Sequence, residues 1–200
     1  MPALRPLLLV FLLLGGGVFS AQAARNTVVV LDPGHGGRDR GTRWGGVSEK
    51  TLTLSIAKKV EARLRARGIS TAMTRRSDVY RTLESRAAVA NSFRKSVFVS
   101  IHCNACAGGG ARGIETFYSG RSGLRLAGSI HNVLDARTST PDRGIKFSRF
   151  TVLRKTSCPA ALVECGFISS PAERRMLVTG VYQDRVARAI ADGIIRALPK

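Results

Sequence analysis

Two histidines and two glutamates stand where a folded chain could bring them to one point. His35 and His102 follow the apolar runs of LDPGH and SVFVSIH, Glu164 ends PAALVE, and Glu49 opens a stretch with helical spacing. Open α/β sheets gather the carboxyl ends of their strands at one edge, where they build their sites. Two imidazoles and one carboxylate with a vacant fourth position form a catalytic zinc set. The remaining carboxylate could then serve as a general base.

The same residue types also have a plainer interpretation. His35 can be only a turn residue among three glycines, and His102 only a hydrogen-bonded histidine at a strand end. The helical His-Glu-x-x-His zinc motif is absent from the chain. Spacing alone therefore leaves both interpretations open. The third histidine, His131, lies on the apolar side of a predicted helix, and we expect it to have a packing role.

Alternating strands and helices are predicted to position these residues. The apolar run at 28–31, closed by a Pro/Gly turn, predicts a buried strand. Leu52, Ile56, Val60 and Leu64 recur every four positions and predict a helix at 49–67. Further strands are predicted at 69–74, 96–101, 113–118, 150–153 and 160–163, further helices at 81–93, 124–134, 171–177 and 181–197, and a polar turn segment at 138–146. This alternation predicts a single α/β domain, with a largely parallel or mixed β-sheet flanked by helices and the site at the strand C-terminal ends.

The first 23 residues have the pattern of an export signal. Arg5 precedes an apolar core at 7–14, and Ala21-Gln22-Ala23 is a small-residue cleavage pattern. The apolar run is short for a membrane span. We therefore predict a signal peptide at 1–23 and a mature domain at 24–200 with no transmembrane segment. The expected location is the periplasm, or the extracellular space and cell wall; an uncleaved N-terminal anchor is the alternative.

The chain is strongly basic. It carries 32 Lys and Arg against 13 Asp and Glu, a formal net charge of +19. Loss of the leader removes only Arg5, which leaves 19 − 1 = +18. Such a domain should seek a polyanion or an anionic surface. Export and the absence of a recognition motif argue against nucleic acid, so cell-wall polymers and lipid headgroups are the expected partners.

The four cysteines are an even number in a chain predicted to reach an oxidising compartment. Two disulfides are therefore possible, in three connectivities. Strand alternation predicts that Cys103 and Cys165 face away from the neighbouring His102 and Glu164. If their strands are neighbours the two could pair; otherwise Cys103 could bond Cys106. The cysteines are Cys103, Cys106, Cys158 and Cys165.

Four motifs, LDPGHGG, SEK before a helix, SIHCNA and ALVECGFISSPAE, occur in this order along the chain. Together they strongly resemble the zinc-dependent N-acetylmuramoyl-L-alanine amidases of bacterial cell walls, the type 3 family. The similarity runs over residues 26–198. The cysteine pair of HCNAC departs from the family, which more often has small residues after the histidine.

The resemblance implies a role for each of the four residues. His35, Glu49 and His102 would bind one Zn²⁺ per chain, and Glu164 would be the catalytic carboxylate. The implied reaction is hydrolysis of the amide between N-acetylmuramic acid and L-alanine of the peptidoglycan stem peptide, by a monomer. Asp32 is a candidate hydrogen-bond acceptor for a zinc-bound histidine. A structural role in an Asp-Pro turn explains this aspartate equally well. Arg143 and the loop 106–112 are candidates for contacts with glycan or peptide.

Two other functions remain open at this point. A zinc peptidoglycan peptidase or carboxypeptidase would use the same metal site on another bond. A non-catalytic, basic wall-binding protein would keep the fold and the charge without turnover.

Overall fold

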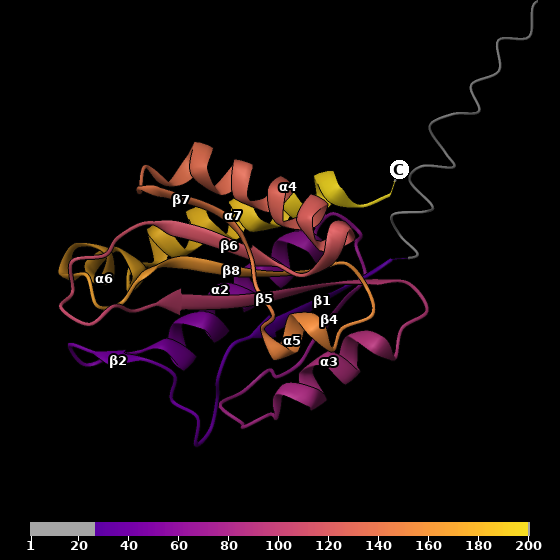
Figure 1. Ribbon diagram of the computed structural model, residues 1–200, viewed down its shortest axis with the longest axis horizontal. Helices are drawn as coiled ribbons and strands as arrows, with labels where there is room; N and C mark the ends of the chain where they lie inside the picture. The colour runs from indigo at the N-terminus through magenta and orange to yellow at the C-terminus, as the bar shows by residue number, and fades with distance from the viewer. Residues whose placement is uncertain (1–26, 200) are drawn as a thin grey trace, which may run out of the picture.

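The sheet at the centre of the molecule has six strands in the order β4-β1-β5-β8-β6-β7 (Figure 1). The computed structural model describes residues 27–199, so the predicted signal peptide lies outside the described residues. Strands β4, β1, β5 and β8 are parallel, β6 is antiparallel to β8, and β7 is parallel to β6. The predicted mixed sheet in one α/β domain is confirmed. The strands are β1 (Val28–Pro33), β4 (Thr71–Met73), β5 (Ser96–Asn104), β6 (Ile114–Tyr118), β7 (Asp142–Phe147) and β8 (Ala160–Phe167).

Helices cover both faces of this sheet (Figure 1). One layer holds α2 (Glu49–Arg65), α4 (Gly120–Thr138) and α7 (Gly180–Ala197), in which α7 packs on both α2 and α4. The other layer holds α3 (Leu83–Asn91) and α5 (Thr151–Arg154). The short helix α6 (Pro171–Leu177) lies at one end, as does a small hairpin of β2 (Arg43–Trp44) and β3 (Val47–Ser48). Among the described residues, no helix has the length and apolar character needed to cross a membrane.

Strand alternation divides the apolar side chains between two cores. Val99 and Val163 point into the larger core, beneath α2, α4 and α7. Phe98 and Leu162 point into the smaller core, beneath α3 and α5. Because successive side chains of a strand point to opposite faces, even-numbered residues of β5 and β8 share the α3/α5 face. His102 and Glu164 therefore emerge on that face, near the carboxyl ends of their strands.

Two local predictions were wrong. Residues 150–153 were predicted as a strand, but the structure has the short helix α5 here, with Phe150 at its N-cap. The consecutive residues Val152 and Leu153 are both buried in the smaller core, which suits a helix because successive residues of a strand point to opposite faces. The segment 138–146, predicted as a polar turn, contains most of β7. β7 is an edge strand with no fully buried residue, so its sequence lacks the apolar alternation of an inner strand.

Candidate metal and catalytic site

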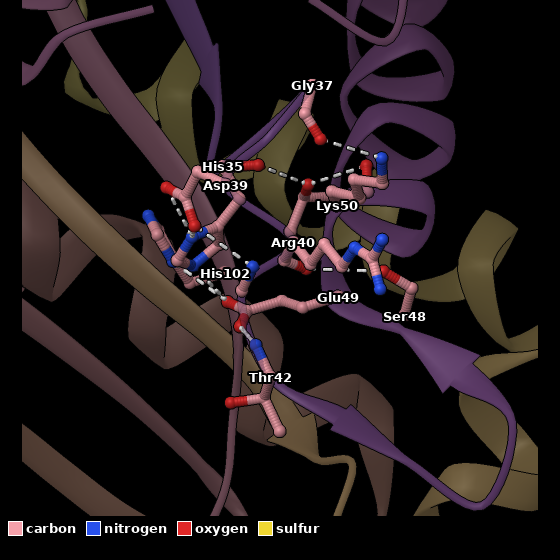
Figure 2. Close-up of polar contacts among 12 residues, drawn as sticks. His35, Gly37, Asp39, Arg40, Thr42, Ser48, Glu49, Lys50 and His102 are labelled. Carbon is pink, nitrogen blue, oxygen red and sulfur yellow. Dashed lines mark hydrogen bonds and ion pairs between the residues drawn. The ribbon is translucent and has the colours of Figure 1, made fainter. Parts of the chain in front are cut away.

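Three side chains from separate elements converge at the carboxyl end of the sheet (Figure 2). His35 follows β1, Glu49 is the first residue of α2, and His102 lies near the end of β5. One ligand atom from each lies within 4.8 Å of the others. The Glu49 Oε1 atom is 3.1 Å from His35 Nε2 and 3.0 Å from His102 Nδ1. The structure thus brings together the three residues expected to bind a metal.

The turn that carries His35 has an unusual backbone conformation. His35 has φ of 61°, in the left-handed region that residues other than glycine rarely adopt. The buried Arg86 guanidinium holds this turn by donating to the carbonyl oxygens of Pro33 at 2.8 Å and of His35 at 2.7 Å. The same guanidinium pairs with Asp32 at 2.8 Å. Asp32 therefore anchors Arg86, and none of its side-chain hydrogen bonds among the described residues goes to a histidine. It lies within β1, so neither the expected histidine contact nor the expected Asp-Pro turn describes it.

The acceptor for His35 is Asp39, which sequence reasoning missed. His35 Nδ1 lies 2.9 Å from Asp39 Oδ1 and 3.0 Å from Oδ2 (Figure 2). Because an ionised carboxylate only accepts, Nδ1 donates, and this tautomer leaves the lone pair of Nε2 for a metal. Glu49 and Asp39 raise the pKa of His35, although burial opposes this. The available signal was a carboxylate four residues beyond the histidine in the same glycine-rich turn.

Glu49 is held as an anion at the centre of the cluster. Its side chain is buried, which disfavours ionisation, yet hydrogen bonds with His102 and His35 hold its pKa well below the usual range. Backbone amides fix both of its oxygens: Thr42 donates to Oε2 at 2.9 Å and Cys103 donates to Oε1 at 3.2 Å. A carboxylate oriented in this way is prepared to bind a cation.

Glu164 lies beside this cluster without joining it. It is the register partner of His102 across β5 and β8. Its Oε2 atom is buried and has no hydrogen-bond partner among the described residues. Burial, and then the negative charge of Glu49, raise the pKa of Glu164 well above the usual range. A buried carboxyl with a raised pKa in a cleft is typical of an acid or base in catalysis.

An open cleft of about 770 Å³ leads to these four residues. Leu83 of α3 and Phe150, beside α5, line it and are 48% and 42% exposed. Arg149 also lines it, whereas the loop 106–112 does not. Arg143, which the sequence suggested as a substrate contact, instead pairs with Glu115 and is not among the lining residues.

The remaining histidine and the cysteines lie outside the cluster. His131 is buried, which agrees with the packing role expected for it. Its two ring nitrogens lie within hydrogen-bonding distance of Thr116 (3.0 Å) and Asp142 (2.7 Å). All four cysteines are free thiols in the structure. Cys103 and Cys165 are buried on neighbouring strands in the larger core, where the neighbouring Cys165 thiol and burial raise the pKa of Cys103 well above its usual range. They face away from His102 and Glu164, as alternation predicted.

The fold and the site define an α/β protein with two histidines and one carboxylate grouped at the strand ends as a candidate metal site. Comparison with known proteins narrows this class. Residues 29–196 match the family described as N-acetylmuramoyl-L-alanine amidase. The chain belongs to the N-acetylmuramoyl-L-alanine amidase family.

Individual relatives agree with this assignment. The amidase LytC of Bacillus subtilis (strain 168) is 36% identical over 183 residues, which are 88% of this chain and 37% of LytC. The solved catalytic domain of CwlV, an amidase of Bacillus (Paenibacillus) polymyxa var. colistinus, matches with a TM-score of 0.83 and 37% identity, over 85% of this chain and 97% of that domain. The amidase AmiC2 of Nostoc punctiforme gives a TM-score of 0.82 and 37% identity, over 86% and 96%. The chain thus spans about a third of LytC and nearly the whole of both solved structures.

Proposed function

We propose that this chain is a zinc-dependent amidase that cleaves the bond between N-acetylmuramic acid and L-alanine of the peptidoglycan stem peptide. The observation that carries the proposal is the pairing of a three-residue candidate metal cluster with a separate carboxyl, Glu164, whose buried Oε2 atom has no hydrogen-bond partner among the described residues. Two imidazole nitrogens and one carboxylate oxygen suit Zn²⁺ and leave a fourth position open for water or substrate. The family described above hydrolyses this class of bond, which supports the choice of substrate.

The chain's own residues have distinct tasks in this reaction. Bound zinc would act as a Lewis acid that polarises the scissile carbonyl and lowers the pKa of water. Burial and the negative charge of Glu49 raise the pKa of Glu164. Glu164 would be ionised more readily with a zinc ion bound nearby, because a positive charge lowers the pKa of a carboxyl group. Glu164 would then take a proton from the attacking water and return one to the leaving amine of L-alanine. Asp39 would keep His35 in the tautomer that binds metal.

The walls of the cleft suggest how a stem peptide would be held. The exposed apolar surfaces of Leu83 and Phe150 offer contact for aliphatic parts of the peptide or for the lactyl group. Arg149, beside Phe150, offers a guanidinium for a carboxylate of the stem peptide. We also propose that the protein is exported, with residues 1–23 removed, and that it acts as a monomer in the periplasm or at the cell wall.

The decisive test is digestion of purified sacculi with and without a zinc chelator. The expected products are bare glycan and intact stem peptide with a free N-terminal L-alanine, and chelation should abolish their release. Cleavage inside the stem peptide would instead identify a peptidase. Binding to sacculi without any release, at full zinc occupancy, would identify a wall-binding protein and contradict the proposed amidase.

A further inference from the structure

A second cleft lies at the opposite end of the sheet from the metal cluster. It has a volume of about 790 Å³ and is formed where β1 and β5 begin and where α7 ends. Thr27 and Pro199, the first and last described residues, both line it. In Figure 1 the C-terminus marks this end, far from β2 and α6 at the other end of the molecule. None of the residues lining this cleft belongs to the metal site.

The rim of the second cleft is cationic. Arg94, Lys95, Arg125 and Arg196 line it and are all exposed. None of the four takes part in the ion pairs found among the described residues. The lining contains no Asp or Glu. Four positive charges around one concave surface, with no ion-pair partner among the described residues, favour an anionic ligand.

The interior of the same cleft is partly apolar. Phe93, Val97, Leu126 and Ala197 contribute to its lining, together with the half-buried Cys158 and Pro159. Polar wall polymers and nucleic acid backbones satisfy positive charge but have no aliphatic segment for such a surface. A phospholipid has both parts, since its phosphate is followed by a glycerol and two acyl chains. We propose that this cleft binds an anionic phospholipid and docks this end of the molecule on a membrane surface.

This docking would orient the enzyme. Strand β5 runs from Ser96 and Val97 in the second cleft to His102 in the metal cluster. Six residues of extended strand span about 20 Å. A molecule seated on the membrane by the second cleft would hold its metal cluster on the far side, toward the wall. This orientation depends on the proposed function, whereas lipid binding does not.

The test is sedimentation of the chain with vesicles of phosphatidylcholine alone or mixed with phosphatidylglycerol. The chain from Ala24 onward is suitable because it contains the complete sheet and both cores, and a solved catalytic domain matches it over 97% of that domain's length. Binding should require phosphatidylglycerol and should weaken with added salt. The variant R94Q/K95Q/R125Q/R196Q should bind at least about tenfold more weakly, since each basic residue near an anionic surface adds about fivefold.

A matched control variant distinguishes binding in the second cleft from nonspecific attraction by the positive charge of the whole chain. R65Q/R67Q/R185Q/R188Q removes four exposed arginines, two at and just beyond the end of α2 and two in α7, and gives the same net charge. It should retain vesicle binding to within about threefold, and both variants should keep the circular dichroism spectrum and muropeptide turnover of the parent. Equal loss of binding in the two variants would overturn the proposal, as would equal binding to both kinds of vesicle.

Calorimetry with soluble probes tests the apolar part of the cleft. Short-chain phosphatidylglycerol, below its micelle concentration, should bind at least about tenfold more tightly than glycerol phosphate, because only the lipid buries acyl surface. Equal affinity for the two probes would overturn the lipid assignment and leave a simple phosphate site. Vesicle sedimentation and calorimetry do not depend on amidase activity, so failure of either binding measurement leaves the proposed function untouched.

Discussion

His102 and Glu164 are direct register partners in the parallel ladder between β5 and β8. Both are even-numbered residues, and the even-numbered side chains of these two strands point toward α3 and α5. The side chains of His102 and Glu164 therefore lie on the same face of the sheet. Their spacing is set by two adjacent, hydrogen-bonded central strands and not by a mobile loop. A candidate metal ligand and a candidate base are therefore held side by side by two inner strands of the sheet. The two glutamates of the site, one in α2 and one in β8, should then respond differently to substitution.

Glu164→Gln should retain zinc at about one ion per chain while turnover falls by about a hundredfold or more, because glutamine keeps the size of the side chain but cannot accept a proton. Glu49→Ala should lose zinc and turnover together, because it removes the central anion of the cluster. Metal analysis and muropeptide turnover on both variants provide the check. Zinc loss in Glu164→Gln, or near-normal turnover, would show that Glu164 is not the base.

Asp39→Asn should weaken zinc binding by about tenfold to a hundredfold, because His35 loses its anionic acceptor and is less firmly held in the tautomer that binds metal. Competition with a zinc-binding dye would measure the change. Asp135→Asn is the control, since Asp135 is exposed on α4 and forms no ion pair with the described residues. Equal zinc affinity in both variants would contradict the role given to Asp39.

Gly34→Ala should disturb the metal cluster directly. A Cβ at this position would lie 2.3 Å from the Cε1 atom of His102, so the imidazole must move. Zinc affinity should fall by at least about tenfold, and added zinc should restore part of the activity. Gly110→Ala is the matched control, because a Cβ there meets nothing within 4 Å. Unchanged zinc affinity in Gly34→Ala would show that the cluster tolerates displacement of His102.

Cys103 and Cys165 should form a disulfide when the protein folds in an oxidising compartment. Both thiols are buried in the same core on neighbouring strands, each one residue beyond the register partners His102 and Glu164, so a short covalent bridge could join them. Peptide mapping by mass spectrometry, without reduction, should find these two residues linked and should find Cys106 and Cys158 outside that bridge. Four free thiols in exported protein, or a bond between Cys103 and Cys106, would contradict this pairing.

Arg149→Gln should raise KM for muropeptides by about fivefold to twentyfold and change kcat little, because the guanidinium would bind a stem-peptide carboxylate away from the scissile bond. Arg154→Gln, a change at an exposed arginine of α5 outside the cleft lining, should leave both parameters unchanged. A similar KM in the two variants would remove Arg149 from substrate binding.

Local sequence was sufficient to predict most of the fold and to select the residues that meet in the candidate site. The four-residue spacing from Leu52 to Leu64 predicted α2, and the apolar runs before His35, His102 and Glu164 predicted β1, β5 and β8. These predictions succeed because periodicity records which face of each element is buried. The resemblance supplied the different roles of the two glutamates, which residue type and spacing alone left open.

Other features of the fold and the site depend on tertiary packing and could not be predicted from local sequence patterns. β7 is a strand because its backbone pairs with β6, and Val152 and Leu153 are helical because both fit one core beneath α3. Arg86 reaches the turn at His35 from α3, fifty-one residues away along the chain. The second cleft gathers residues from the two ends of the described chain. Contacts between residues far apart in sequence depend on how whole elements pack, so a single sequence indicates which residues could react but not which neighbours will hold them.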